Sequence, residues 1–483
     1  MMPVTNQDTL TILFTNDIHS HFGAMGRIAA MIDELQAQAP GPTLVLDIGD
    51  HMDRAAPETE GTMGQANIDV LNLTGYDAVT IGNNEGLTFT PDLLKEAYSG
   101  LRSPVVCGNI LDKRTGAPPA WMSPHLVMNK GNFRVGLIGA TAAFADFYDL
   151  LGLVALDPRE TIASSVQQLR GDVDLIIVMS HLGLSIDKEL AETVPGIDII
   201  IGGHTHHLLE EPLVIGSTTI TAAGKFGRYL GKIEVLRRPE AGAPFTMNGI
   251  CIPVEEGLAQ DKVQQAIELS RETAKAQLGR GVAATAKELP IDYASESPFG
   301  NLLAQAVRRF TNTDFSIVNS GQLLAGLPAG EISLGMLHER CPSPINPCRM
   351  RLKGEDILYS LEESLVDEVT EKVIFGFGFR GKVLGGICVD GLDIVYDPTA
   401  QPYHRIVQAS ISGTPLLEEQ SYNVGTLDMF SFGIGYERLK NGSHKEFMLP
   451  DFLRDLLRLE LQTAGAVENC FTPRWTKFNS KEV

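Results

Sequence analysis

The segment GGHTHH at residues 202–207 holds the side chains with the clearest chemical potential in the chain. It follows a short β-branched run, III at 199–201, which is typical of a buried strand in a parallel sheet. The two glycines permit a sharp turn at the strand end, and His204 and His206 can then face one cation or two neighbouring cations. A surface turn with solvated histidines is the alternative for this segment taken alone.

The same arrangement, an apolar strand followed by potential metal ligands, recurs along the first half of the chain. Residues 10–16 lead to Asp17 and His19, residues 43–48 to Asp50, residues 78–81 to Asn83, and residues 175–179 to His181. Ligands bind outside the carboxyl ends of strands in open α/β sheets, so we expect these side chains to converge on one crevice. Mixed oxygen and nitrogen ligands favour Zn, Mn or Fe, whereas Ca or Mg would favour oxygen alone.

Such a crevice is suited to hydrolysis of phosphoesters or related anionic esters. Two metals about 3.5–4 Å apart can share one carboxylate, for which Asp50 is the natural candidate, and hold a bridging hydroxide. They can clamp both the attacking and the leaving oxygen of an in-line displacement. We therefore expect two divalent cations, Mn, Zn or Fe, as cofactors.

These side chains must be positioned by alternating strands and helices, which the sequence shows from residue 10 to about 235. Helical segments at 26–38 and 164–170 separate the apolar strands, and strands at 134–139 and 229–235 complete the pattern. We expect a first domain at 5–240. A linker at 241–281 carries a helix at 261–278, and a second domain follows at 282–475 with helices near 301–310 and 354–365 and a strand region at 387–396.

Length and charge narrow the possible partners. A chain of 483 residues implies two or three domains, and a formal charge of −21 argues against a nucleic-acid-coating surface. A small phosphorylated substrate drawn by local cations is still allowed. The amino terminus lacks a signal-peptide pattern and no run of about 18 apolar residues occurs, so we expect a cytoplasmic protein with no membrane partner. The sequence carries no signal for an oligomeric state.

Taken together, the motifs resemble those of a known family. The motifs are NDIH at 16–19, GD at 49–50 with Asp53, GN at 82–83, SH at 180–181 and GGHTH at 202–206. Their order and spacing are similar to those of the calcineurin-like metallophosphoesterases, and the downstream half resembles the carboxyl-terminal domain of 5′-nucleotidases. The resemblance implies a four-layer αββα sandwich followed by a smaller α/β substrate domain. It also implies one metal held by Asp17, His19, Asp50 and His206, and another held by Asp50, Asn83, His181 and His204.

Asn84 departs from the family pattern. Family members usually carry His at this position, paired with an Asp three residues later, where this chain has Leu87. The family His is thought to protonate or stabilise the leaving group, and an amide can donate a hydrogen bond but cannot transfer a proton at neutral pH. General-acid help is worth about 10²–10⁴-fold, so we expect a preference for low-pKa leaving groups, or recruitment of another acid such as Glu85, His21 or His51.

In the second domain, the segment NSG at 319–321 resembles a family motif whose following Arg binds substrate phosphate. This chain has Gln322 there instead, so Asn319 and Gly321 are kept as substrate-binding candidates without that Arg. Arg340, Arg349 and Arg351 could replace it as a phosphate fork, and surface salt bridges are the alternative for these arginines.

The family stacks a nucleobase between two aromatic rings. Ile387 falls near the first ring position, and Phe430, Phe432 or Tyr436 near the second. Each stacked base is worth about 1–3 kcal/mol, so loss of one ring weakens nucleotide selectivity. We select Phe430 and Phe432 as candidates for binding the base.

The leading hypothesis is a cytoplasmic two-metal hydrolase of the 5′-nucleotidase type, active in nucleotide catabolism, in which a metal-bridging hydroxide attacks the phosphoester and Asp50 and Asn84 take part in catalysis. The alternatives within this class are a cyclic-nucleotide phosphodiesterase and a nucleotide-sugar pyrophosphate hydrolase. A catalytically weak sensor of a phosphorylated ligand is the alternative of another class, since the family His and Arg are both replaced.

Overall fold

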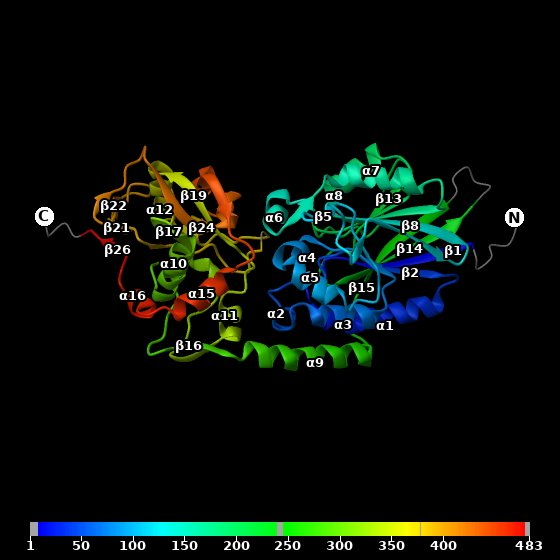
Figure 1. The fold of residues 1–483 in the computed structure, drawn as a ribbon, viewed down its shortest axis with the longest axis horizontal. Helices are drawn as coiled ribbons and strands as arrows, with labels where there is room; N and C mark the ends of the chain where they lie inside the picture. Colours follow the sequence, from blue (N-terminus) through cyan, green and yellow to red (C-terminus); the bar gives the residue numbers. More distant parts are fainter. Residues whose placement is uncertain (1–7, 239–244, 377, 479–483) are drawn as a thin grey trace. The chain divides into compact units, whose positions relative to one another are not determined.

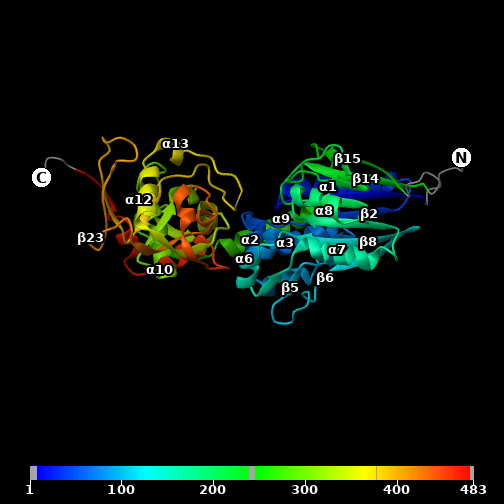
Figure 2. The ribbon, with the colours of Figure 1, turned by 90° about the horizontal axis from the view of Figure 1, so that it is seen from above.

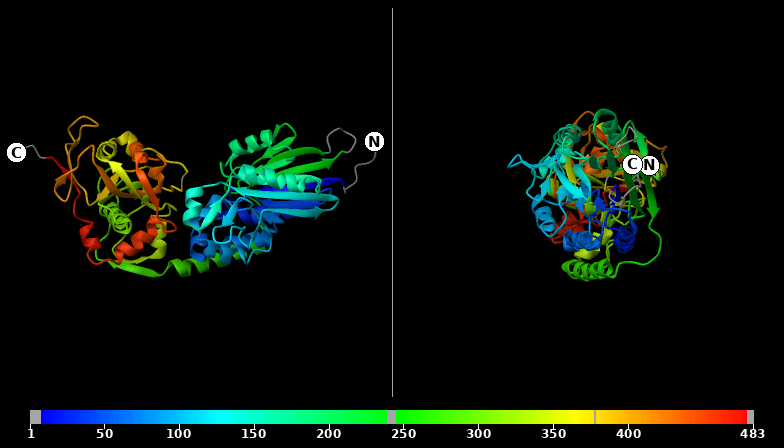
Figure 3. Two further views of the ribbon diagram at one scale, coloured as in Figure 1. Left: turned by 45° about the horizontal axis from the view of Figure 1, so that its top comes forward. Right: turned by 90° about the vertical axis from the view of Figure 1, so that its right-hand side faces the viewer.

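The computed structural model describes residues 8–238, 245–376 and 378–478. It divides the chain into two compact units, Met1–Ala274 and Lys275–Val483, here called unit 1 and unit 2. Figures 1, 2 and 3 show them in sequence colours, with unit 1 running from blue to green and unit 2 from green to red.

Unit 1 contains two large sheets. Within its described residues the first sheet has the order β15-β14-β1-β2-β3-β4-β6, with β15 (Phe245–Pro253), β14 (Tyr229–Arg237), β1 (Thr9–Thr15), β2 (Thr43–Asp47), β3 (Ala78–Val79), β4 (Val105–Val106) and β6 (Met122–Ser123). The second has the order β12-β13-β11-β10-β8-β7, with β12 (Leu213–Ile215), β13 (Thr218–Thr221), β11 (Ile199–Gly202), β10 (Leu175–His181), β8 (Phe133–Thr141) and β7 (His125–Lys130). A small pair, β5 (Ile110–Asp112) and β9 (Leu153–Ala155), lies outside them.

Helices cover the outer faces of both sheets. The helices of unit 1 are α1 (Phe22–Gln38), α2 (Pro57–Thr62), α3 (Gln65–Thr74), α4 (Asn83–Thr88), α5 (Pro91–Tyr98), α6 (Ala145–Leu150), α7 (Pro158–Leu169) and α8 (Leu184–Thr193), and α9 (Asp261–Leu278) begins in this unit. In Figure 1, α7 and α8 lie on one side of the strands and α1 and α3 on the other.

The buried side chains of unit 1 show why these layers form. Successive strand residues point to opposite faces, so Ile12 and Phe14 of β1 pack between the sheets while Leu13 packs against α1 and α3. In the second sheet, Ile177 of β10 faces the first sheet, and Val178 faces α7 and α8. Helix, sheet, sheet and helix therefore form four layers, and the αββα fold expected from the sequence is confirmed.

Parallel pairing places the functional strand ends on common edges. Strand β1 is parallel to β2, and β2 to β3; in the other sheet β8, β10, β11 and β13 are parallel neighbours. The carboxyl ends of parallel strands lie at the same edge of a sheet, so residues far apart in sequence meet there.

Unit 2 has one principal sheet. Among the described residues its order is β20-β17-β24-β19-β25, with β20 (Ile387–Asp390), β17 (Phe315–Asn319), β24 (Ser421–Leu427), β19 (Pro347–Lys353) and β25 (Ser443–Phe447). Smaller sheets join β23 (Thr414–Pro415), β22 (Ile406–Ile411), β21 (Asp393–Tyr396) and β26 (Trp475–Lys477), and pair β16 (Gly281–Thr285) with β18 (Gly330–Ser333). Its helices are α10 (Pro298–Thr311), η1 (Ser320–Gln322), α11 (Leu334–Arg340), α12 (Gly354–Glu363), α13 (Asp367–Thr370), α14 (Asp428–Ser431), η2 (Glu437–Asn441), α15 (Leu453–Leu461) and α16 (Ala466–Asn469).

The region 241–281 is more structured than the linker expected from the sequence. Residues 245–253 form β15, which pairs with β14 as an edge strand because polar and apolar residues alternate along it. The helix expected at 261–278 is confirmed as α9, and the division between the units falls within it, after Ala274. The expected domain limits at 5 and 240, and the Pro- and Gly-containing stretch 239–244, lie outside the described residues.

The strand expected at 78–81 is shorter in the structure, where β3 ends at Val79 and a loop leads to α4. Among the described residues, no helix is both long and apolar enough to cross a membrane.

Candidate metal centre

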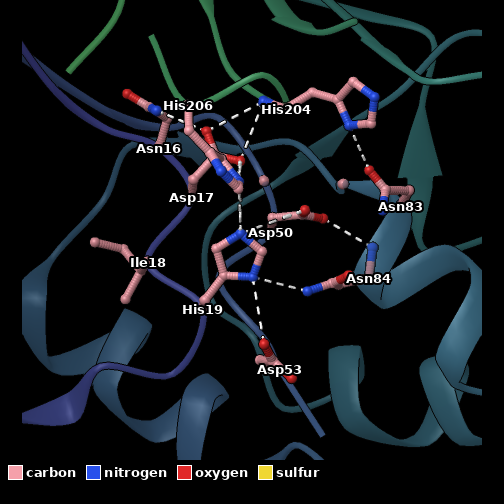
Figure 4. Close-up of polar contacts among 12 residues, drawn as sticks. Asn16, Asp17, Ile18, His19, Asp50, Asp53, Asn83, Asn84, His204 and His206 are labelled. Atoms are coloured by element: carbon pink, nitrogen blue, oxygen red, sulfur yellow. Dashed lines mark hydrogen bonds and ion pairs between the residues drawn. The ribbon is translucent and has the colours of Figure 1, made fainter. Parts of the chain in front are cut away.

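Seven side chains predicted as metal ligands meet in unit 1, and Figure 4 labels six of them, all but His181. Asp17 and His19 follow β1, Asp50 follows β2, Asn83 opens α4 after β3, His181 ends β10, and His204 and His206 follow β11. The carboxyl ends of five strands from both sheets, and the segments that follow them, therefore build one centre, as expected from the parallel strands.

Distances divide these side chains into two overlapping groups. The Nε2 atoms of His19 and His206 lie 3.1 Å apart, and Asp17 Oδ1 lies 3.5 Å from His206 Nε2. On the other side, Asp50 Oδ2 lies 3.3 Å from His181 Nε2, and His204 Nδ1 lies 2.7 Å from Asn83 Oδ1.

Asp50 lies between the two groups. Its Oδ2 atom is 3.7 Å from His19 Nε2 and 3.3 Å from His181 Nε2. Ligand atoms of Asp17, His19 and His206, and those of Asp17, Asp50 and His181, each lie within 4.8 Å of one another, as a shared cation requires. The arrangement is compatible with both expected ligand sets.

The chemistry of His181 fits a cation. Its Nδ1 atom lies 2.8 Å from the carbonyl oxygen of Ile48, which fixes the ring and directs Nε2 into the centre. Nε2 is buried and has no hydrogen-bond partner among the described residues. Burial opposes protonation, but the Asp50 and Asp17 carboxylates outweigh it and raise the pKa of His181 to about 10. Buried carboxylates around a bare imidazole nitrogen are a suitable donor set for divalent metals.

The backbone at the centre is strained. Five of the seven ligand candidates have positive φ angles, from +48° to +72°, although none is glycine: Asp17, His19, Asp50, His204 and His206. Such conformations cost of order 1–3 kcal/mol each and persist where surrounding contacts fix them, commonly at functional sites. The strand-end loops are therefore held in the geometry that aims these side chains inward.

Glu85 holds two of these loops together. Its carboxylate accepts hydrogen bonds from the backbone N–H groups of Gly82, Asp50 and Met52, at 2.8, 3.1 and 2.8 Å. Asn16 performs a similar task, because its amide donates to Asp17 and to the carbonyl of Gly224, both at 2.7 Å. Neither role was deduced from the sequence, since each depends on loops that only the fold brings together.

The Asn84 amide contacts a predicted ligand. Asn84 Nδ2 lies 2.8 Å from His19 Nδ1, and the Asn84 backbone N–H donates to Asp50 Oδ1 at 2.8 Å. Asp53 Oδ2 lies 3.5 Å from the same His19 nitrogen. The side chain that replaces the family His thus orients His19, and its part in catalysis stays a prediction.

The three other residues considered as general acids, Glu85, His51 and His21, differ in their exposure to solvent. Glu85 is fully buried and engaged with backbone amides, and His51 is 2% exposed and hydrogen-bonded through Nδ1 to Asn67. His21 is exposed at the start of α1, and its ring stacks on Phe226 with centroids 3.9 Å apart.

Lys225 and Phe226 at the centre were missed by sequence reasoning. The Phe226 ring lies 5.7 Å from the His19 ring and 6.5 Å from the His206 ring, centroid to centroid. Their position after β13, which pairs in parallel with β11, is the feature of the sequence that could have identified them. That strand reads TTIT, so it lacks the apolar run that revealed the others.

In unit 2, Asn319 and Gly321 serve the fold. The Asn319 amide is fully buried and donates to the carbonyl of Leu384, at 2.5 Å, and accepts from Gln322 at 3.0 Å. A Cβ on Gly321 would meet the carbonyl oxygen of Val383 at 2.1 Å, so only glycine fits there. Their contact with substrate remains a prediction.

The three arginines considered as a phosphate fork do not share one place. Gly321 follows the end of β17, and β17 is parallel to β24. Arg351 pairs with Asn423 near the start of β24, so it lies toward the opposite edge of the sheet from Gly321. Arg349 forms an ion pair with Glu446 at 2.6 Å. Arg340 is nearer the Gly321 turn, because its carbonyl accepts the N–H of Leu324. The register therefore favours Arg340 over Arg349 and Arg351 as a neighbour of that turn.

The two phenylalanines selected for base stacking differ in exposure. Phe430 is fully buried and packs edge-on against the buried ring of Tyr436, with centroids 5.8 Å apart. Its ring is unavailable to a ligand in this structure, because the short helix α14 carries it into the core of unit 2. Phe432 is 47% exposed and stacks on Phe447, and Ile387 is buried.

Comparison with known proteins agrees with this architecture. Residues 10–208 match the calcineurin-like phosphoesterase family, and residues 280–440 match the 5′-nucleotidase carboxyl-terminal domain. The metallophosphoesterase YunD of Bacillus subtilis is 34% identical over 94% of this chain and 99% of its own length. The 5′-nucleotidase of Rattus norvegicus is 24% identical over 85% of this chain and 79% of its own length.

Solved structures show the same two-domain fold. A 5′-nucleotidase precursor from Thermus thermophilus aligns with a TM-score of 0.59 and 23% identity, covering 98% of this chain and 100% of its own. The NAD nucleotidase of Haemophilus influenzae aligns with a TM-score of 0.67 and 15% identity, covering 98% of both chains. With its seven metal-ligand candidates in a phosphoesterase domain and a 5′-nucleotidase domain after it, the chain belongs to the calcineurin-like phosphoesterase family, in the two-domain form shared with 5′-nucleotidases.

Proposed function

We propose that this hydrolase cleaves small phosphorylated metabolites, nucleotides among them, at a centre that holds two divalent cations. The observation that carries the proposal is the convergence of seven O- and N-donor side chains from five strand ends, with Asp50 between two groups of histidines. Relatives named metallophosphoesterase and 5′-nucleotidase support the reaction class, hydrolysis of phosphoester bonds.

The protein's own groups prepare the centre for the reaction. Asp17, Asp50, Asn83 and the four histidines would hold the cations, which supply charge to phosphoryl oxygens and make water nucleophilic near neutral pH. The Ile48 carbonyl and the Asn84 amide fix the rings of His181 and His19. Because these groups are positioned before substrate arrives, little reorganisation accompanies the reaction.

Asn84 should affect mainly which leaving groups the enzyme can expel. An amide cannot supply a proton at neutral pH, and the carboxylic acid beside it, Glu85, is buried under three backbone amides. Leaving groups of low pKa, such as an aryl oxide or a phosphate, need no such proton. The proposal therefore favours aryl phosphates and phosphoanhydrides over alkyl monoesters, which includes the nucleotide-sugar pyrophosphate alternative.

Selectivity for the nucleobase should be weak. Among the three rings considered in unit 2, Phe430 and Tyr436 are buried and only Phe432 is exposed, and a buried Ile387 stands at the other expected ring position. One stacked base is worth about 1–3 kcal/mol, so rates for different nucleoside substrates should lie within roughly tenfold of one another.

The test is turnover of p-nitrophenyl phosphate by protein reconstituted with Mn. Asp50→Asn should lower kcat/KM by at least about 100-fold, because the amide removes charge between the two groups of ligands. Asp172→Asn, at an exposed carboxylate before β10, is the matched control and should retain the wild-type rate. Saturable binding of inorganic phosphate with no turnover of any phosphorylated compound would instead support the sensor alternative.

A further inference from the structure

A basic and aromatic segment after β13 borders the metal centre. Phe226 has a φ of +65°, and its backbone N–H donates to the carbonyl of Asp17 at 2.8 Å. This bond fixes a strained backbone next to a metal-ligand candidate, as at the ligands themselves. The segment is therefore built into the centre.

The Phe226 ring positions the cationic side chain of Lys225. The Lys225 Nζ atom lies 4.6 Å from the ring centroid, and the Arg228 guanidinium carbon lies 5.9 Å from it. The His21 ring stacks on the same phenyl group. A cation held over an aromatic ring is attracted by its negative face, so the ammonium is directed without an ion pair.

No carboxylate lies within 4 Å of Lys225 Nζ in the part of the chain that the structure describes, although the protein carries a charge of −21. Lys225 is half-buried, and the Phe226 ring that holds its ammonium lies 6.5 Å from the His206 ring, centroid to centroid. An uncompensated cation beside a phosphate-binding centre is available for an anionic ligand.

The other side of the centre is different. There the exposed ring of Phe144 lies 6.1 Å from the His204 ring, centroid to centroid, and brings no charge. Lys225 and Arg228 therefore add positive charge on the side of the centre formed by His19 and His206. A substrate that carries a second anionic group should therefore bind with that group on the Lys225 side of the centre.

We propose that Lys225, held by Phe226, recognises a second phosphate next to the scissile phosphorus, so that the preferred substrates are phosphoanhydrides such as nucleoside diphosphates. This inference rests on the proposed function and names its substrate class. Lys225 acts as a specificity-determining residue, and Arg228 adds long-range attraction for the same anion.

The reaction balances without a protein acid. The oxygen of water forms a bond to the terminal phosphorus, and the bond from that phosphorus to the bridging oxygen breaks. The electron pair remains on the second phosphate, which leaves as an anion, while one proton of water is released to solvent. A phosphate monoester has a second pKa of about 6, so this group leaves unprotonated, and the Lys225 ammonium stabilises the charge that Asn84 cannot neutralise.

The experiment compares ADP with p-nitrophenyl phosphate on Mn-loaded protein. Both leaving groups have low pKa values, but only ADP has a second phosphate. Lys225→Gln should reduce the ratio of kcat/KM for ADP to that for the aryl phosphate by about 10- to 100-fold, the usual effect of a bond to a charged group. Lys225→Arg should restore most of the ratio. Lys232→Gln, at a lysine paired with Glu234, is the control and should keep it.

Binding supplies a second readout. Titration calorimetry with methylenediphosphonate, which cannot be hydrolysed at its bridge, should show a similar loss of affinity in Lys225→Gln, with a smaller change for orthophosphate. An unchanged ratio and unchanged diphosphonate affinity would overturn the inference while leaving the proposed function intact. Failure of the wild-type protein to hydrolyse either substrate would remove the proposed function itself.

Discussion

At the scale of single residues, Glu85 has the most easily isolated role. Its two oxygens accept three backbone N–H groups, from Gly82, Asp50 and Met52, and so fix the loops that carry Asp50 and Asn83. In Glu85→Gln one oxygen becomes an amide donor facing backbone donors. We predict a loss of roughly 1–3 kcal/mol in unfolding free energy and a 10- to 100-fold weaker affinity for Mn.

Urea unfolding and metal titration measure these two effects, with Glu96→Gln on the exposed face of α5 as the control. Equal behaviour of the two variants would show that the Glu85 bonds do not organise the centre.

Residue types and spacing predicted that these seven side chains would meet, because each stands at the end of an apolar strand and strand ends converge in this fold. The same reasoning could not predict how the ligands are held. The positive φ angles at Asp50 and His206 are features of the folded backbone that the residue types do not reveal. The hydrogen bond from Asn16 to Gly224 joins two loops more than a hundred residues apart in the sequence. Phe430 shows the converse: the family resemblance made it a candidate for binding the base, but packing against Tyr436 buries its ring.

At the scale of elements, the close approach of two loops after β2 and β3 is decisive. Gly49 has a φ of +86°, and a Cβ there would lie 2.5 Å from the backbone nitrogen of Gly82. Gly75, after α3, has a φ of +82°, but a Cβ there would meet no atom within 4 Å. Substitution of Gly75 therefore measures the cost of the left-handed backbone alone, whereas substitution of Gly49 adds a clash between the two loops.

We predict that Gly75→Ala costs about 1 kcal/mol of unfolding free energy, since only the left-handed backbone opposes it. Gly49→Ala should cost several kcal/mol and also reduce Mn binding, because the loop that carries Asp50 must move. Urea denaturation and metal titration measure both. Similar costs at the two positions would contradict the importance of the loop contact.

The pattern of elements was more predictable than their edges. The strands with β-branched apolar runs were identified because burial on both faces leaves a continuous signal. β15 was taken as linker, since its half-exposed alternation is interrupted by glycine at 249. The arginines of β19 could not be placed from sequence, because strand register decides which edge of the sheet they occupy.

At the scale of the whole molecule, each unit has its own hydrophobic core. The core of unit 2 is formed by residues from 289 to 470, and the three cores of unit 1 by residues from 10 to 267. All seven ligand candidates belong to unit 1. We therefore predict that a fragment of residues 1–274 binds about two equivalents of Mn, whereas a fragment of residues 275–483 binds none at comparable affinity.

Equilibrium dialysis followed by elemental analysis measures this stoichiometry, and circular dichroism confirms that each fragment is folded. A folded first fragment that holds no Mn would show that unit 2 is needed to complete the centre.

The most direct measurement is anomalous diffraction at the manganese edge from crystals of the Mn-loaded protein. We predict two peaks beside Asp50, one within bonding distance of Asp17, His19 and His206, and the other within bonding distance of Asn83, His181 and His204. A single peak, or peaks that avoid Asp50, would contradict a two-metal centre built from these strand ends.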